Sequence, residues 1–417
     1  MSLTTFTDIA QKAKKASQNT SQIREANINS TIADLASLIK EKSGDILAIN
    51  REDVATAQEN NLSEAMIDRL TLSDERINAL ISSLKIIQEL PDPVGETLHE
   101  TTRPNGLIIR KIRVPIGVIG MIYESRPNVT IDAAALCLKS HNAVILRGGS
   151  ECFKTNQFLH HLIQESLEKN GLPIDLVSFI PSTDRAMVDE MLKAHQYIDV
   201  LIPRGGKSLT EKVQKEAQMA VFSHLDGICH IYVDESVKPD IARDVIVNAK
   251  MRRPGICGAM ETLLLDTQLP PPQKKDLINQ LIKAGCTIRA DEEIQQLDKR
   301  VEPASEDDWS TEYLAPIISV KVVSGVEEAI QHINHYGSHH TDSILAEDPD
   351  IVDLFLTNVD SGIVMHNTST QFADGGEFGM GAEIGIATGK LHARGPVALE
   401  QLTTYKYYVL GDGQIRD

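Results

Sequence analysis

One cysteine of the chain stands in a segment whose composition can make its thiol reactive. Cys257 follows Arg252, Arg253 and a Pro-Gly pair, and an apolar run comes after it. Only the thiolate is a strong nucleophile, and cationic neighbours or a helix N-terminus lower the thiol pKa from about 8.5. The Pro-Gly pair indicates a loop. The segment therefore predicts a nucleophilic cysteine, and composition alone leaves open a cysteine that only packs.

The other four cysteines lie in segments typical of protein interiors, within or at the ends of apolar runs. A buried thiol surrounded by apolar groups is inert and behaves as a small hydrophobic side chain. We therefore expect structural roles for Cys137, Cys152, Cys229 and Cys286.

Length, composition and charge restrict the class of protein. The chain has 417 residues, 41% of them hydrophobic, which is enough for two or three globular domains. The longest apolar stretch, 114–123, is interrupted by proline and glycine and is shorter than the roughly 20 residues of a membrane span. A formal net charge of -18 argues against nonspecific binding to nucleic acid or to an anionic membrane. Sparse, unpaired cysteines and the lack of a signal sequence favour the cytoplasm.

Hydrophobic periodicity predicts the elements that position these residues. The first 90 or so residues have helical spacing, and 103–114 alternate like a β arm. From Pro115 strands and helices alternate, which is typical of a parallel sheet with helices on both faces. Strands are expected at 116–123, 142–147, 176–180, 198–202 and 228–233, and helices at 129–139, 151–169, 184–194 and 207–216.

A second α/β region follows from about residue 234, and the tail at 402–410 resembles a strand. The expected division is a cofactor-binding domain over 1–233, a catalytic domain over 234–385 and a return segment with an oligomerisation strand over 386–417. The fold class is α/β, with two parallel-sheet domains and a small β arm.

Ligands of parallel α/β sheets bind beyond the carboxyl ends of the strands. Glycines and arginines concentrate at these ends in the first region, so we expect a ligand site, which the resemblance described below makes the cofactor site, at Arg147, Gly148, Gly149, Arg204, Gly205 and Gly206. Arginines beside glycine or proline are also candidates for holding an anionic substrate, and Arg126, Arg253 and Arg394 are such arginines.

Two other patterns are weaker. Gly206-Lys207-Ser208 resembles the end of a P-loop, but position 201 is leucine where that motif needs glycine. His332, His335 and His339 could share a helical face, yet no carboxylate or cysteine ligand accompanies them, and we expect no metal. His340, near Asp342, is interpreted as a residue of a substrate pocket.

Several long segments together resemble the aldehyde dehydrogenase superfamily, and within it the γ-glutamyl phosphate reductases. The resemblance runs from about residue 8 to the C-terminus. The segments that carry it include 62–66, 123–130 (Tyr-Glu-Ser-Arg-Pro-Asn-Val-Thr), 143–149, 201–206, 229–235, 391–396 and 402–406.

The resemblance implies roles for individual residues. Cys257 becomes the expected nucleophile, and Asn128 stands where the superfamily places the side-chain amide of its oxyanion hole. Glu312 resembles the glutamate that steadies the nicotinamide ribose, and Arg147 suits the 2′-phosphate of NADPH. The implied substrate is L-glutamyl 5-phosphate, the cofactor NADPH or NADP, and the partners a second copy of the chain and glutamate kinase.

Two departures from the superfamily pattern accompany the resemblance. Hydrolytic members carry a glutamate base where this chain has His224-Leu225-Asp226-Gly227, and Gly258 directly follows the cysteine where related reductases often have asparagine. The missing base argues against a nonphosphorylating NAD(P) aldehyde dehydrogenase. That enzyme and a noncatalytic partner of glutamate kinase are the two alternatives.

Overall fold

The computed structural model describes residues 5–416, which form two compact units. Unit 1 contains the described residues up to Ser223 together with Gly379–Gly385 and those from Val397 onward. Unit 2 contains His224–Phe378 and Ile386–Pro396. No helix among residues 5–416 combines the length and apolar character needed to cross a membrane.

The boundary between the units falls earlier than the expected boundary at 233/234. The strand β8 (Cys229–Val233) pairs with strands of unit 2 on both of its edges, so the residues that lead into it belong to unit 2 as well. The return segment expected over 386–417 is also divided, because Ile386–Pro396 stay with unit 2. Strand pairing, which periodicity does not encode, decides both points.

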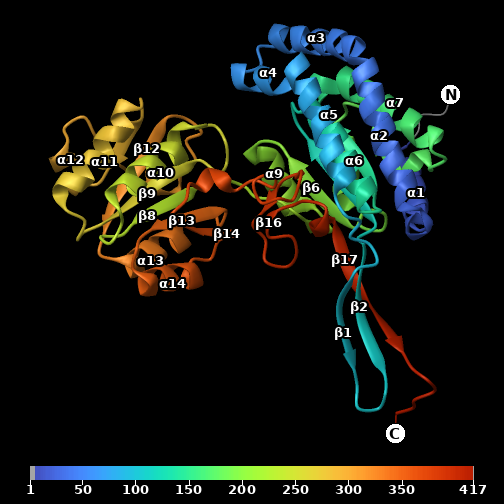
Figure 1. Cartoon of the computed structure of the whole chain (residues 1–417). Helices are drawn as coiled ribbons and strands as arrows, with labels where there is room; N and C mark the ends of the chain where they lie inside the picture. Colours follow the sequence, from blue (N-terminus) through green and yellow to red (C-terminus); the bar gives the residue numbers. More distant parts are fainter. Residues whose placement is uncertain (1–4, 417) are drawn as a thin grey trace. The chain divides into compact units, whose positions relative to one another are not determined.

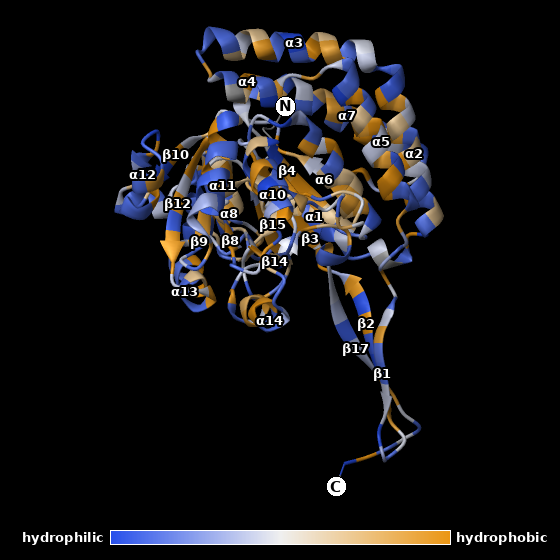
Figure 2. Cartoon of the chain, turned by 60° about the vertical axis from the view of Figure 1, so that its left-hand side comes forward, coloured by the Kyte–Doolittle hydropathy of each residue, from blue (hydrophilic) through white to orange (hydrophobic). Residues whose placement is uncertain are grey.

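Helices cover the sheet of unit 1. Their apolar residues recur at helical spacing, and Figure 2 shows hydrophobic and hydrophilic bands alternating along α2 and α3. The helical elements are α1 (Phe6–Ser17), η1 (Thr20–Gln22), α2 (Glu25–Glu41), α3 (Ser43–Glu59), α4 (Glu64–Leu70), α5 (Asp74–Glu89), α6 (Pro127–Lys139), η2 (Ser150–Cys152), α7 (Phe153–Lys169), η3 (Ile174–Leu176), α8 (Ala186–Lys193), α9 (Lys207–Glu216) and η6 (Glu400–Leu402).

The main sheet of unit 1 is parallel, with strand order β5-β4-β3-β6-β7. Every residue of its two central strands β3 and β4 is buried, as expected for strands covered on both faces. The predicted alternation of strands and helices in this region is confirmed. The strands are β3 (Val118–Tyr123), β4 (Ala143–Gly148), β5 (Val177–Phe179), β6 (Val200–Arg204) and β7 (Ala220–Val221).

A three-stranded antiparallel arm also belongs to unit 1. The strands β1 (Thr97–Thr102) and β2 (Ile108–Pro115) form a hairpin, and β17 (Thr403–Leu410) pairs with β2 along its whole length. Figure 1 shows the three strands extending away from the rest of the unit. The C-terminal strand expected from the tyrosine-rich tail therefore pairs within its own chain.

Unit 2 is built on a parallel seven-stranded sheet of order β11-β10-β12-β9-β8-β13-β14. Hydrophobic clusters pack between this sheet and its helices. The strands are β8, β9 (Met260–Asp266), β10 (Thr287–Ala290), β11 (Glu302–Pro303), β12 (Ile317–Val323), β13 (Thr341–Leu345) and β14 (Ile363–His366), and β15 (Ile386–Ala387) pairs with β16 (Gly395–Pro396) apart from the sheet. The helical elements are α10 (Pro239–Met251), α11 (Pro271–Lys283), α12 (Glu292–Leu297), η4 (Glu306–Ser310), α13 (Val326–Tyr336), α14 (Pro349–Asn358) and η5 (Thr370–Phe372).

Candidate active site

Three loops of unit 2 bring a thiol and two imidazoles together. His224 precedes β8, Cys257 precedes β9 and His340 precedes β13, and these three strands are neighbours in the sheet. The ligand atoms of the three side chains all lie within 4.8 Å of one another. Because the strands are parallel, the loops that precede them meet at one edge, here the amino edge. The candidate site of unit 2 therefore lies at the edge opposite to the one that ligands of parallel sheets usually occupy.

The two histidines change the acidity of the Cys257 thiol. Burial by itself would raise the thiol pKa, but the positive charge of His340 and a hydrogen bond with His224 outweigh it. The net result is a pKa well below the usual value for cysteine. A thiol paired with imidazolium in this way is held as the nucleophilic thiolate. The sequence suggested arginines for this role, whereas histidines have the largest lowering effect.

A backbone carbonyl fixes the tautomer of His224. Its Nδ1 lies 2.8 Å from the carbonyl oxygen of Ile386, which can only accept, so Nδ1 carries the proton. In the neutral ring Nε2 then has the lone pair that can take the thiol proton. His340 is fully buried, with Nδ1 2.9 Å from Thr341 Oγ1, and its ring meets that of His224 edge to face at 5.0 Å between centroids. The pair is thus preorganised around the sulfur.

The remaining cysteines are all buried, as predicted. Burial raises the pKa of Cys152 and of Cys286 to about 12, and it raises the pKa of Cys137 and Cys229 as well. A thiol with such a pKa stays protonated at neutral pH. Cys257 is the only cysteine within residues 5–416 that combines partial exposure with a lowered pKa.

Gly227 connects the nucleophile to Glu312. Its N–H donates to Glu312 Oε1 at 2.9 Å, and a Cβ at this position would lie 2.2 Å from the carbonyl oxygen of Cys257. Only glycine allows the two backbones to approach so closely. Burial raises the pKa of Glu312, the Gly227 hydrogen bond opposes that rise, and the negative charge of Cys257 adds to it.

We expect Gly227→Ala to lower kcat by about 10²-fold, because displacing a reacting group by an ångström has an effect of this size. The added methyl group must push away the backbone of Cys257, with which it would collide. The measurement is steady-state turnover together with a thermal unfolding curve. Gly44→Ala is the matched control, since a Cβ there meets nothing within 4 Å. An unchanged kcat in Gly227→Ala would contradict the expected coupling of the two loops.

A buried ion pair supports the same region. Lys250 Nζ and Glu261 Oε2 are 2.5 Å apart with both side chains fully buried, and Glu261 Oε1 accepts a hydrogen bond from the N–H of Leu314 at 3.3 Å. Lys250 lies in the last turn of α10, the helix before the Cys257 loop, and Leu314 belongs to the segment that carries Glu312. The pair thus ties together the segments on both sides of the nucleophile.

Two predicted substrate residues of unit 2, Arg253 and Arg394, are not among the three side chains of the thiol cluster, which consists of His224, Cys257 and His340. Arg253 is exposed, and Arg394 Nη2 donates to Asp360 Oδ1 at 2.9 Å and to the Asp360 carbonyl oxygen at 3.1 Å. Arg394 therefore holds a loop in the present structure. The proposed contacts of both arginines with substrate stay predictions.

The other predicted residues lie in unit 1. Asn128 is half-buried in the first turn of α6 and donates to Asp132 Oδ2 at 3.2 Å. Arg147 is buried, and its guanidinium donates to the carbonyl oxygens of Gly148 and Thr183 at 2.9 and 3.2 Å. Arg126, like Asn128, is half-buried. The oxyanion-hole, 2′-phosphate and substrate roles of these three residues stay predictions.

The predicted cofactor-binding arginines and glycines lie at the carboxyl edge of the unit 1 sheet. Arg204 ends β6, and Gly205 and Gly206 lead into the N-terminus of α9. The Gly206 N–H donates to Glu124 Oε2 at 2.8 Å, so a carboxylate already sits where the helix N-terminus would bind an anion. Gly148 ends β4 at the same edge and Gly149 follows it, and added Cβ atoms there would meet Asn156 and Glu151. The cofactor role of these residues stays a prediction.

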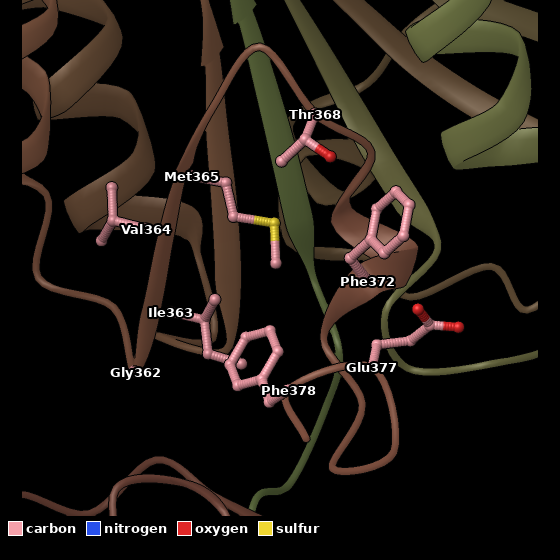
Figure 3. Close-up of a pocket in the computed structure, with 8 residues that line it drawn as sticks. All are labelled: Gly362, Ile363, Val364, Met365, Thr368, Phe372, Glu377 and Phe378. Atoms are coloured by element: carbon pink, nitrogen blue, oxygen red, sulfur yellow. The ribbon is translucent and has the colours of Figure 1, made fainter. Parts of the chain in front are cut away.

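A separate pocket of about 510 Å³ lies along β14. Figure 3 shows that Ile363, Val364 and Met365 come from the strand, whereas Phe372, Glu377 and Phe378 come from the segment that follows it. Its lining includes none of the three side chains of the thiol cluster. We assign no role to this pocket.

His224 is the site residue that sequence reasoning missed. The sequence analysis used the segment from His224 to Gly227 only for what it lacks, a glutamate base. The available signal was the histidine itself. It can act as a general base, and it lies in the segment where hydrolytic members of the superfamily carry their glutamate base. His224 meets Cys257 because β8 and β9 are neighbours in the sheet, and the sequence pattern does not predict this strand order.

Comparisons with known proteins show which proteins this chain resembles. The model described as the aldehyde dehydrogenase family matches residues 3–295. The chain is 53% identical over 411 residues to a γ-glutamyl phosphate reductase of Paramagnetospirillum magneticum, covering 99% of this chain and 97% of that protein. It is 54% identical over 408 residues to one of Zymomonas mobilis subsp. mobilis, covering 98% and 95%.

Solved structures agree. The crystal structure of a γ-glutamyl phosphate reductase from Thermotoga maritima has a TM-score of 0.96 at 42% identity and covers 99% of this chain and 100% of that one. An engineered glycolyl-CoA reductase solved with bound NADP⁺ has a TM-score of 0.68 at 16% identity and covers 97% of this chain and 96% of that one. The second similarity concerns the fold alone.

Proposed function

The chain belongs to the aldehyde dehydrogenase family and, within it, to the γ-glutamyl phosphate reductases, and from this premise we propose how it acts. It reduces L-glutamyl 5-phosphate to L-glutamate 5-semialdehyde and releases phosphate, a step of proline biosynthesis. The observation that carries the proposed mechanism is the Cys257 thiol between two imidazoles.

Cys257 attacks the acyl carbonyl carbon of the substrate as a thiolate. The C–O bond to phosphate breaks, phosphate leaves, and the acyl group becomes a thioester of Cys257. His224 takes the thiol proton on Nε2 before the attack, since its Nδ1 is held as a donor by Ile386. His340 stabilises the thiolate by its charge. The Asn128 amide and the Cys257 backbone N–H are the predicted donors to the oxyanion.

NADPH, when bound, supplies the hydride that converts the thioester into the aldehyde. The residues of this chain hold the cofactor. The α9 N-terminus with Gly205 and Gly206 is the proposed phosphate cradle, and Glu312 is proposed to hold the nicotinamide ribose. The Glu312 carboxylate accepts the Gly227 N–H, which fixes it against the loop of the nucleophile. No metal ion takes part in this scheme.

Homo-oligomer formation through the β arm and location in the cytoplasm complete the proposal. The support for an oligomer is β17, whose residues after Thr403 are exposed although they lie in a paired strand. Sparse cysteines, all of them free in the structure, support a reducing compartment. A contact with glutamate kinase stays a prediction.

The reverse reaction tests the proposal. We expect the purified protein to reduce NADP⁺ with glutamate 5-semialdehyde only when inorganic phosphate is present, because phosphate must attack the Cys257 thioester to release it. Absorbance of NADPH measures the rate, and arsenate in place of phosphate is a chemical control. Turnover without phosphate would instead indicate a hydrolytic dehydrogenase. No turnover under any condition would favour the noncatalytic binding partner.

A further inference from the structure

The thiol and the two imidazoles that activate it together have the composition of a metal site. Cys257, His224 and His340 offer one sulfur and two nitrogens, all within 4.8 Å of one another. Thiolate and imidazole are the ligands that Zn²⁺ and other thiophilic cations prefer, whereas Mg²⁺ and Ca²⁺ prefer oxygen. We propose that this cluster binds one Zn²⁺ ion per chain and that the bound ion reversibly blocks the nucleophile.

The geometry requires little rearrangement. With Zn–S near 2.3 Å and Zn–N near 2.0–2.1 Å, tetrahedral ligand atoms lie about 3.3–3.6 Å apart. The sulfur and the two nitrogens lie no more than 4.8 Å apart, so side-chain movements of about an ångström bring them to these distances. Three protein ligands leave one position for water, as in zinc sites that are open to solvent.

A hydrogen bond that would orient one of the metal ligands is already present. A histidine that ligates a metal almost always donates its other N–H to a carbonyl or carboxylate. His224 Nδ1 makes this contact with the Ile386 carbonyl oxygen at 2.8 Å. The buried ring of His340 interacts with the Cys257 thiol, and its Nε2 has no other hydrogen-bond partner in the described part of the chain. That nitrogen is therefore available to a metal ion that also binds the sulfur.

Both imidazoles must be neutral to bind the metal, so binding forms one S–Zn bond and two N–Zn bonds and releases to solvent any proton that the thiol and these imidazole nitrogens carry. The sulfur electron pair needed for attack on the substrate is then shared with the metal.

The inhibitory consequence rests on the proposed function, but metal binding itself does not. We would titrate the metal-free full-length protein with Cd²⁺, a spectroscopic substitute for Zn²⁺, and follow the ultraviolet charge-transfer band of the thiolate–Cd²⁺ bond. We expect one equivalent to bind, Zn²⁺ to displace it and Mg²⁺ to have no effect. Zn²⁺ should also protect Cys257 from alkylation, with EDTA restoring both alkylation and turnover.

Variants show whether Cd²⁺ binds at this site or at other thiols and imidazoles of the chain. Cys257→Ser should abolish the band, and His224→Gln should weaken Cd²⁺ binding by at least about 100-fold, since even outer contacts of a metal site contribute 10–100-fold. His161→Gln, at an exposed histidine of α7, is the matched control and should bind like the parent. An unchanged band in Cys257→Ser or in His224→Gln, or alkylation that Zn²⁺ does not slow, would overturn the inference. A protein without reductase activity that still shows the Cys257-dependent band would contradict the proposed function and support the metal site.

Discussion

Replacing Cys257 by serine is expected to lower kcat by about 10⁴-fold or more, the range seen when a catalytic nucleophile is removed. Serine is nearly isosteric, but its hydroxyl has a pKa far above that of a thiol, and the two histidines cannot hold it as an alkoxide. The thiol pKa, by contrast, is well below its usual value beside His340 and His224. Initial rates in metal-free buffer measure the loss.

Cys286→Ser is the matched control for this substitution. Cys286 is buried in unit 2, and its Sγ already lies 3.6 Å from the Thr287 carbonyl oxygen, so a serine hydroxyl has an acceptor there. We expect Cys286→Ser to retain turnover. In the parent protein iodoacetamide should label Cys257 ahead of the other four cysteines, which mass spectrometry of digested protein detects. Retained turnover in Cys257→Ser would remove the thioester from the mechanism.

Lys250→Met is expected to destabilise the protein by about 3–5 kcal/mol, because it leaves the buried Glu261 carboxylate without its counter-ion. Burial raises the pKa of Glu261, and the charge and hydrogen bond of Lys250 now oppose that rise. Without Lys250 the folded-state pKa of this carboxyl rises further above the usual 4.5. The folded state then holds a proton that the unfolded state has lost, so the variant loses stability as the pH rises above that value.

The double variant Lys250→Met with Glu261→Gln tests this explanation. The amide oxygen of glutamine can still accept the hydrogen bond from the Leu314 N–H, and no buried charge remains. We expect the double variant to recover most of the lost stability and to lose the added pH dependence. Urea unfolding midpoints over a pH series measure both. A double variant that is as unstable as Lys250→Met would show that the cost comes from packing around residue 250 and not from an unpaired charge.

Much of the fold followed from local patterns. The alternation of apolar runs and helical spacing gave the α/β class and the elements from β3 to α9, because each element is specified by its own residues. The long segments around Arg126, Arg204 and Arg394 identified the family. The choice of Cys257 among five cysteines also came from sequence: its loop neighbours made it a candidate, and the family resemblance made it the expected nucleophile.

The sequence by itself thus determined the fold class and the family, and it predicted Cys257 as the nucleophile. The tertiary structure decided what surrounds that nucleophile. His224, Cys257 and His340 are far apart in the chain and meet only because β8, β9 and β13 are adjacent and parallel, so the loops before them share one edge. Strand order depends on the packing of the whole sheet, which no local pattern records. Strand order also places β8 in unit 2. It brings two histidines to the thiol, and these, more than the arginines, lower the pKa of Cys257.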